Sequence, residues 1–247
     1  MSSPSVSIIV PTRNEGENID PLVSQIIAQG VPFREILFID DDSTDGTRES
    51  IQSLSRSHPI RLIEQNPDEP GLAAAIMSGA SAAKGELLVV MDADLSHPPD
   101  RIKDLLAPLQ AGTVDMVIGS RYIKGGSIPA WPLWRRIISR AGSALAYPLT
   151  KQQDSMSGFF AIARARLLEI NPPTVGFKIA FETILRGGPA LRVNEIPIAF
   201  HDRARGESKM SFGIALRFLY RWLIAVFRQA LFPNPKRRDH KSERRQN

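Results

Sequence analysis

Short, nearly continuous apolar runs alternate along the first half of the chain with longer segments of helical periodicity. The apolar runs are Ser5–Pro11, Glu35–Asp40, Ile60–Glu64, Gly85–Met91 and Asp115–Gly119. The intervening helical segments are Glu17–Gln29, Asp45–Ser55, Gly71–Ala83 and Pro99–Gln110. Strands that are apolar on both faces and alternate with helices are typical of an α/β protein whose mainly parallel central sheet is covered by helices on both sides.

Local signals set the expected ends of these elements. Pro11 is expected to end the first strand, Asn14 to cap the first helix, and Asp45 or Ser43 to cap the second. Past Arg121 the pattern loosens. The segment from Ile123 to Trp134 is long and rich in Gly, Pro and Trp, and a mobile lid and a packed connector are about equally compatible with it.

The rest of the chain continues the alternation. The expected elements are a helix over Arg135–Leu149, an extended segment over Gly158–Ala163, a helix over Phe177–Arg186 and a strand over Leu191–Ile198.

Polar residues gather where the apolar runs end. The four clusters are Pro11–Glu15, Asp40–Asp42, Asp92–Ser96 and Ser120–Tyr122. Because α/β sheets bind ligands beyond the carboxyl ends of their strands, these clusters predict one shared site. No G-x-G-x-x-G motif follows the first run, so a dinucleotide cofactor is not expected.

The stretch Met91–Pro99, "MDADLSHPP", carries the most specific candidate chemistry. Asp92 and Asp94 point the same way if the strand geometry persists, so they could share a divalent cation, with a diphosphate supplying further oxygen ligands. The alternative is a solvated turn in which Asp94 or Ser96 caps the helix that begins near Pro98. For the motif alone, the capping turn is the better interpretation.

Composition narrows the classes of function. The chain has 247 residues, of which 43% are hydrophobic and 23% charged, as expected for one large folded domain. It has no cysteine, which excludes disulfides, thiolate zinc sites and cysteine nucleophiles. Most of the net charge of +5 lies in Lys236–Arg245, where six basic residues accompany two acidic ones. The nearly neutral remainder argues against nucleic-acid binding. The N-terminus lacks the features of a signal peptide.

Eight motifs occur in a recognisable order. They are "PTRNE", "DDDSTDGT", "DADLSHPP", "GSRY", "RRIIS", "DSMSGF", "GFK" and "RARGESK". Between about Ser5 and Met210 the chain therefore resembles the family 2 glycosyltransferases with a GT-A fold, a Rossmann-like nucleotide-diphospho-sugar transferase fold. Within that family it is most similar to the dolichyl-phosphate (polyprenyl-phosphate) mannosyltransferases.

The resemblance implies transfer of mannose from GDP-mannose to the phosphate of dolichol or another polyprenol, with inversion and with Mg²⁺ or Mn²⁺ as cofactor. The implied donor-binding residues are Pro11, Arg13, Glu15, Ile39, Asp41, Asp92, Ala93, Asp94, Ser96, Arg121, Lys178, Arg203 and Lys209. Of these, Asp92, Asp94 and Ser96 would hold the metal. The implied catalytic residues are Asp94, Arg121, Asp154, Arg203 and Lys209, and Arg135 and Ser139 would meet the acceptor phosphate.

The residue chemistry agrees with this reaction. A phosphate monoester with a second pKa near ~6 is mostly dianionic at neutral pH, so it attacks without a general base. The chain has no evident Ser-His or Cys-His constellation. Two alternatives remain open: another sugar nucleotide such as UDP-glucose with the same acceptor, and a metal-dependent nucleotidyl or phosphoryl transferase.

A polyprenyl phosphate acceptor implies a membrane surface. We expect a catalytic domain over residues 1–210, an amphipathic C-terminal helix over 211–232 and a basic tail over 233–247. Arg217, Arg221 and Arg228 form one narrow stripe on that helix. The helix would lie in the membrane interface, or pack on the catalytic domain or on a small membrane-anchoring partner subunit. The expected location is peripheral, at the cytoplasmic face of a membrane.

Overall fold

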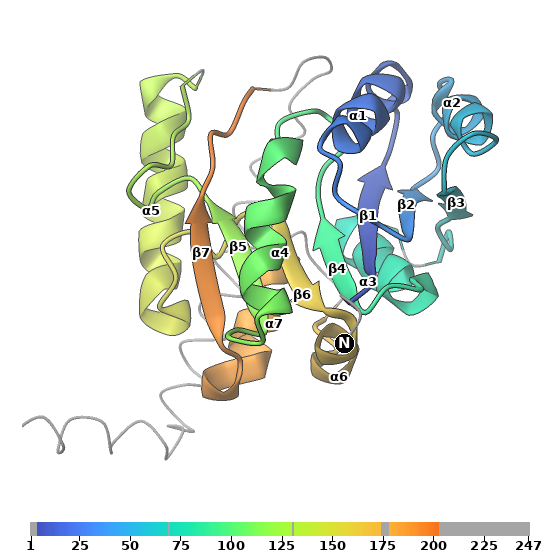
Figure 1. Ribbon diagram of the computed structural model, residues 1–247. Coiled ribbons are helices and arrows are strands. Elements are labelled where there is room, and N and C mark those ends of the chain that lie inside the picture. The colour runs from blue at the N-terminus through green and yellow to red at the C-terminus, as the bar shows by residue number, and fades with distance from the viewer. Residues whose placement is uncertain (1–3, 69, 130, 174–177, 203–247) are drawn as a thin grey trace, which may run out of the picture.

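The computed structural model describes residues 4–68, 70–129, 131–173 and 178–202. Within them the chain forms a seven-stranded sheet with the order β3-β2-β1-β4-β6-β5-β7 (Figure 1). The strands are β1 (Val6–Thr12), β2 (Glu35–Asp40), β3 (Ile60–Glu64), β4 (Leu87–Val90), β5 (Met116–Ser120), β6 (Phe160–Ala163) and β7 (Val193–Pro197). Among the strands of the described ranges, only β6 runs antiparallel to its neighbours, β4 and β5. The mainly parallel α/β architecture is confirmed.

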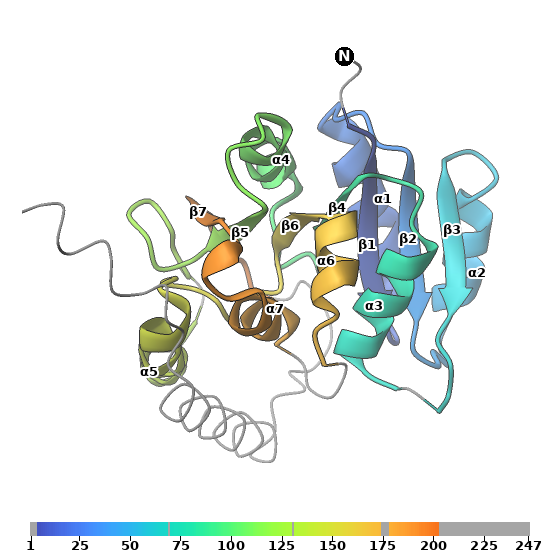
Figure 2. The same cartoon turned by 90° about the horizontal axis from the view of Figure 1, so that it is seen from below.

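Helices cover both faces of the sheet. They are α1 (Gly16–Ala28), α2 (Thr47–Leu54), α3 (Leu72–Ala82), α4 (Ile102–Gln110), α5 (Leu133–Thr150), α6 (Arg164–Ile170) and α7 (Ile179–Gly187), with the short 3-10 turns η1 (Pro99–Arg101) and η2 (Gly188–Ala190). One core cluster joins α1, α2 and α4 to the sheet, and a second joins α3, α6 and α7 to its other face (Figure 2).

Alternation along the strands feeds both cores. In β1 the side chains of Ile8 and Val10 enter the first cluster, while Ile9 enters the second. This follows from the two-residue side-chain period of a strand. It explains why the central strands are apolar at nearly every position.

Two expected element ends are wrong. Pro11 does not end β1, which continues to Thr12; beyond Ile9 the strand pairs with β2 alone, so an N–H can be missing there. Asn14 does not cap α1. It adopts a left-handed backbone with φ 56°, and its Oδ1 accepts a hydrogen bond from the Thr44 N–H instead. The first N–H of α1, at Gly16, is bound by Asp45 across the sheet edge.

The segment between β5 and α5 is a packed connector in this structure. The Ser127 N–H donates to the Ile198 carbonyl at 3.0 Å, and the Phe200 N–H donates to the Ser127 carbonyl at 2.9 Å. Trp131 is buried at the end of the same segment. These contacts tie the connector to the chain that follows β7.

The helix α5 contributes no residue to either core cluster. It lies beyond the β7 edge of the sheet and packs mainly on α7 (Figure 1). Its large side chains are consequently more exposed than those of the other helices. No helix in the described ranges is long and apolar enough to span a membrane. The expected C-terminal helix and basic tail lie outside the described residues.

Candidate functional site

The turn after β4 holds Asp94 and Ser96 in fixed positions. Asp94 is 4% exposed, and its Oδ1 accepts hydrogen bonds from the Ser96 N–H at 3.1 Å and from the Ser96 hydroxyl at 2.6 Å. Leu95 between them has a left-handed backbone, with φ 63°. The following turn η1 begins after Pro98 without a side-chain cap. The helix-cap interpretation of this motif is therefore wrong.

Asp92 is the more accessible carboxylate of the pair. Its side chain is 36% exposed, while its backbone N–H donates to His97 Nδ1 at 2.9 Å. Because Nδ1 accepts this bond, the proton of the neutral imidazole sits on Nε2. Burial lowers the pKa of His97, although the charges of Asp92 and Asp94 oppose the shift. His97 is thus a buried hydrogen-bond partner of the Asp92 backbone through Nδ1.

Arg121 and Asp154 form a buried ion pair at the end of β5. Asp154 Oδ2 accepts from the Arg121 backbone N–H at 2.9 Å and from Nε at 2.7 Å, while Oδ1 accepts from Nη2 at 2.7 Å. Burial alone would lower the pKa of Arg121, but the charge and hydrogen bonds of Asp154 raise it above its ordinary value. Arg121 therefore enters the site as half of a pair and not as an isolated cation.

Glu195 on β7 holds the chain that carries Asp154. Its two carboxylate oxygens accept the backbone N–H groups of Gln153 at 2.7 Å and of Asp154 at 2.8 Å. Hydrogen bonds therefore link β7, the loop before β6 and the end of β5 through Glu195, Asp154 and Arg121. Such hydrogen bonds orient a loop that would otherwise lack regular structure.

Lys178, the residue before α7, points toward the same region. Its Nζ donates to the Met156 carbonyl at 2.9 Å. Burial and the positive charge of Arg121 lower the pKa of Lys178 to about 8, against the opposing charges of Asp154 and Asp92. This lysine is therefore mostly protonated at neutral pH and loses its charge as the pH rises through about 8.

The candidate donor residues from β1 and β2 occupy the neighbouring strand ends. Arg13 and Asp41 face each other across the sheet edge, with 3.5 Å between Nη1 and Oδ2. Pro11 and Glu15 are half-buried. Ile39 is completely buried in the core, and its carbonyl accepts from Thr12 Oγ1. Any contact of Ile39 with a ligand would have to come from its backbone.

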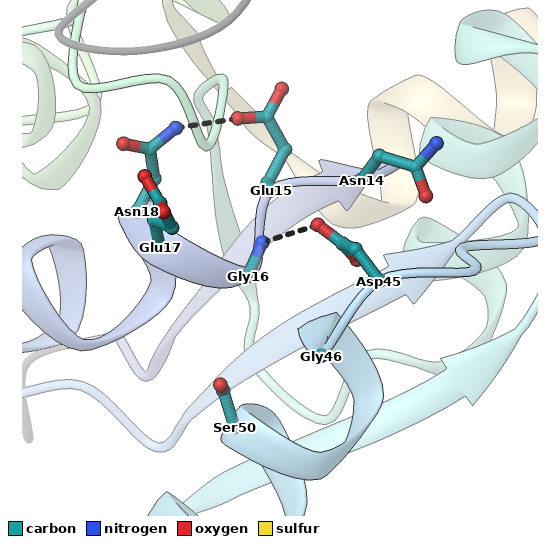
Figure 3. A pocket seen from close by; sticks show the side chains of 8 residues that line it. All are labelled: Asn14, Glu15, Gly16, Glu17, Asn18, Asp45, Gly46 and Ser50. Atoms are coloured by element: carbon teal, nitrogen blue, oxygen red, sulfur yellow. Dashed lines mark hydrogen bonds between the residues drawn. The ribbon is translucent and has the colours of Figure 1, made fainter.

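A cavity of about 560 Å³ lies behind these strand ends, where α1 and α2 begin (Figure 3). Its lining residues are Asn14, Glu15, Gly16, Glu17, Asn18, Asp45, Gly46 and Ser50. Asn18 Nδ2 donates to Glu15 at 2.7 Å, and Asp45 accepts from Gly16, as the dashed lines in Figure 3 show. The cavity walls are acidic, which disfavours a phosphate there.

The candidate acceptor residues lie on α5. Ser139 Oγ accepts from the Tyr122 hydroxyl at 2.6 Å, and the Arg135 guanidinium stacks on the Trp131 ring at 3.9 Å and reaches Asp202 at 3.4 Å. Arg121 in turn lies over the rings of Tyr122 and Trp131. These two aromatic side chains connect the acceptor candidates to the buried ion pair. Arg203 and Lys209 lie outside the described residues.

A family model places this architecture among known proteins. The model for "Glycosyl transferase family 2" matches residues 7–172, which include six of the seven strands. The chain belongs to glycosyl transferase family 2.

Two relatives of this family 2 glycosyltransferase are both dolichol-phosphate mannosyltransferases. It is 42% identical to a dolichol-phosphate mannosyltransferase of Pyrococcus furiosus over 83% of this chain, and it spans 59% of that protein's length. It is 37% identical to a dolichol-phosphate mannosyltransferase of Saccharomyces cerevisiae, over 86% of this chain and 84% of the relative.

Among solved structures, the chain resembles a mannosyltransferase of Pyrobaculum calidifontis in complex with GDP-Man and Mn²⁺. The TM-score is 0.64 at 22% identity, and the alignment covers 94% of this chain and 65% of that one. A glucosyl-3-phosphoglycerate synthase of Mycobacterium tuberculosis in complex with Mn²⁺, UDP and glucosyl-3-phosphoglycerate aligns with a TM-score of 0.69 at 18% identity, over 94% and 81% of the two chains. These two likenesses agree with the GT-A fold.

Sequence reasoning about this family 2 glycosyltransferase missed several residues that shape the site. Glu195, Tyr122 and Trp131 contact candidate residues directly, and of these three only Tyr122 belongs to one of the eight motifs, "GSRY". The available signal was the place of Tyr122 in that motif, because Glu195 lies in a segment that also contains Arg192 and Asn194 and so does not stand out. His97 lies within the motif "DADLSHPP", but nothing in the sequence indicates its bond to the Asp92 backbone.

Proposed function

We propose that this protein transfers mannose from GDP-mannose to the phosphate of dolichol or another polyprenol, with inversion at the anomeric carbon. The observation that carries the proposal is the 42% and 37% identity to dolichol-phosphate mannosyltransferases over more than four fifths of the chain. The aligned region contains the strand ends at which Asp92, Asp94, Arg121 and Asp154 gather.

The turn after β4 fits a hard divalent cation, Mg²⁺ or Mn²⁺. Asp92, Asp94 and Ser96 offer carboxylate and hydroxyl oxygens, the ligand type that both ions take. The parts of the chain that the structure describes contain no group of three His, Asp or Glu residues able to hold a metal by themselves. The donor diphosphate would therefore complete the coordination. A bound ion would stabilise the negative charge that develops on the leaving nucleotide.

The reaction needs no proton acceptor. An oxygen of the dianionic acceptor phosphate attacks C1 of mannose, the bond from C1 to the β-phosphate oxygen breaks, and GDP leaves with the electron pair. Catalysis then depends on positioning and on fixed charges. We assign Asp154, held by Arg121, to the sugar side, Lys178 to the donor, and Arg135 with Ser139 to the acceptor phosphate. By resemblance alone, Arg203 and Lys209 complete the donor site.

The α5 surface supports a membrane-bound acceptor. Its outer face exposes Leu133 (70%), Trp134 (61%), Ile137 (59%) and Ile138 (56%). Arg136 and Arg140 are exposed on the same helix. Aromatic, aliphatic and basic side chains together are typical of helices that lie in the interface of anionic lipids. Because α5 also carries the acceptor candidates, we propose that this face meets the bilayer, as a peripheral protein at the cytoplasmic side.

Transfer to lipid tests the function. The purified protein is incubated with polyprenyl phosphate, Mn²⁺ or Mg²⁺, and labelled GDP-mannose, UDP-glucose or UDP-N-acetylglucosamine in parallel. Label should enter the organic phase from GDP-mannose alone. Asp94→Asn should reduce the rate about 10²–10³-fold, as expected when a stabilising group at a developing charge is lost. The control Asp104→Asn alters an exposed surface pair with Arg101 and should leave the rate unchanged. Label from UDP-glucose, or release of free sugar without lipid product, would refute the proposal.

Liposome flotation tests the membrane surface. The double variant Ile137→Ser/Ile138→Ser should bind anionic liposomes more weakly than the wild type. Ile27→Ser on α1 is the matched control, since Ile27 is also an exposed aliphatic residue, at 36%, but lies on a different helix. Equal flotation of both variants would refute a role for α5.

A further inference from the structure

His97 is one of the most buried polar residues of the protein. It is 1% exposed, its ring stacks on Phe159 with 5.2 Å between centroids and 13° between planes, and it meets the edge of Phe200 at 5.6 Å. These rings leave the imidazole no freedom to rotate without repacking the core beside it. A polar group held this rigidly has a fixed direction for its hydrogen bonds.

Both nitrogens of the ring face Asp92. Nδ1 accepts the Asp92 backbone N–H at 2.9 Å, and Nε2 lies 3.8 Å from Asp92 Oδ2. Met91, the first residue after β4, still donates its N–H to the Ile9 carbonyl at 3.1 Å, whereas the N–H of the next residue, Asp92, is bound by His97. His97 therefore supplies the hydrogen-bond acceptor for the Asp92 N–H, in place of a neighbouring strand.

Gly158 confines the same carboxylate from another side. A Cβ atom at Gly158 would lie 3.2 Å from His97 Cε1 and 3.5 Å from each Asp92 carboxylate oxygen. A side chain at residue 158 would thus be tight against His97 and in van der Waals contact with Asp92, so the chain before β6 borders both residues. Asp92 is held at its backbone by His97 and bordered at its carboxylate by Gly158.

We propose that His97 is a positioning residue that fixes Asp92 in the orientation required for divalent cation binding. The inference rests on the proposed function, because that function assigns Asp92 and Asp94 to the metal. A group that orients a metal ligand is typically worth about 10–100-fold in metal affinity. His97 would act through its hydrogen-bond acceptor, Nδ1, and not by contacting the metal.

Three substitutions separate the acceptor from the ring. His97→Phe keeps an aromatic ring for stacking but removes the acceptor. His97→Asn places a carbonyl oxygen near the position of Nδ1 and restores the acceptor. His97→Gln carries its amide one bond farther, toward the position of Nε2, and serves as a smaller, polar counterpart if the phenylalanine variant does not fold.

Mn²⁺ binding in the presence of GDP is measured by the loss of the electron paramagnetic resonance signal of free Mn²⁺. His97→Phe and His97→Gln should raise the apparent Kd for Mn²⁺ about 10–100-fold, whereas His97→Asn should stay close to the wild type. In transfer assays at saturating Mn²⁺, the Phe and Gln variants should reach most of the wild-type kcat. A general loss of folding would not allow this recovery.

The outcomes distinguish this inference from the function on which it rests. Mn²⁺ binding that Asp94→Asn leaves unchanged would overturn the metal assignment and the positioning role with it. Binding that depends on Asp94 but is unaffected in both His97→Phe and His97→Gln would overturn the role of His97 alone. Equal weakening in the Asn and Gln variants would also refute it, because the position of the acceptor would then be irrelevant.

Discussion

Replacing Asp154 by asparagine should strongly destabilise the protein even without substrate. The carboxylate accepts three hydrogen bonds from Arg121, and both side chains are almost completely buried. Asparagine has one acceptor oxygen, and its amide N–H₂ would face the donors that remain. The substitution also leaves the Arg121 charge buried without a counterion. Breaking a buried pair in this way costs about 3–5 kcal/mol.

The protein contains a matched control for burial. Arg192 binds Asp115 through the same three atoms, with the backbone N–H at 2.9 Å, Nε at 3.1 Å and Nη2 at 2.9 Å. That pair is exposed, at 55% for the Arg192 side chain and 24% for Asp115. Water can therefore solvate Arg192 when its partner is removed. Asp115→Asn should cost at most about 1 kcal/mol.

Thermal unfolding followed by circular dichroism compares the two variants. For a chain of this length, each kcal/mol corresponds to about 2–4 °C in Tm. Asp154→Asn should thus lower Tm by about 6–20 °C, and Asp115→Asn by no more than about 4 °C. Equal shifts in the two variants would show that burial does not set the strength of the Arg121–Asp154 pair.

Three further predictions concern single residues. Glu35→Gln should lower the free energy of unfolding by about 2 kcal/mol at pH 7, because the buried carboxylate accepts hydrogen bonds from the Arg61 side chain, the Lys84 N–H and Ser7. These bonds outweigh burial and hold the pKa of Glu35 below 4.5, so the difference should shrink as pH falls below that value. Since the pKa of Lys178 is lowered to about 8, the KM for GDP-mannose should rise above that pH, while Lys178→Arg should show no such rise. Glu195→Gln should reduce kcat about tenfold, because its amide can accept only one of the two N–H groups that hold the Asp154 backbone.

Each of these predictions has a contrary result. Chemical denaturation that gives Glu35→Gln the same deficit at pH 3 as at pH 7 would refute the linkage. The folded pKa of Lys178 lies below that of an unfolded lysine, so the unfolded chain binds more protons between about pH 8 and 10.5, and this residue makes stability rise with pH there. An equal rise in KM above pH 8 in wild type and Lys178→Arg would contradict the KM prediction, and an equal slope of stability against pH in wild type and Lys178→Met would contradict the lowered pKa. An unchanged kcat in Glu195→Gln would exclude the positioning role.

The apolar pattern alone located most of the elements. The strand Glu35–Asp40 and the strand Ile60–Glu64 were predicted with the bounds that the structure has, and α1 within one residue at each end. Short buried strands and amphipathic helices leave such a pattern because each side chain's burial follows from its place in the local repeat. The helix α6 was missed, since only seven residues form it directly after β6.

The sequence by itself determined the α/β class, the polar clusters at the strand ends and the Asp92–Asp94 motif, because these depend on residues that are close together along the chain. Only the tertiary structure decided that β6 runs antiparallel, that Asp154 pairs with Arg121 and that Glu195 holds the Asp154 backbone. These partners are 33 and 41 residues apart. A buried charge must find a counterion, but which one it meets is set by the order and direction of the strands that carry them.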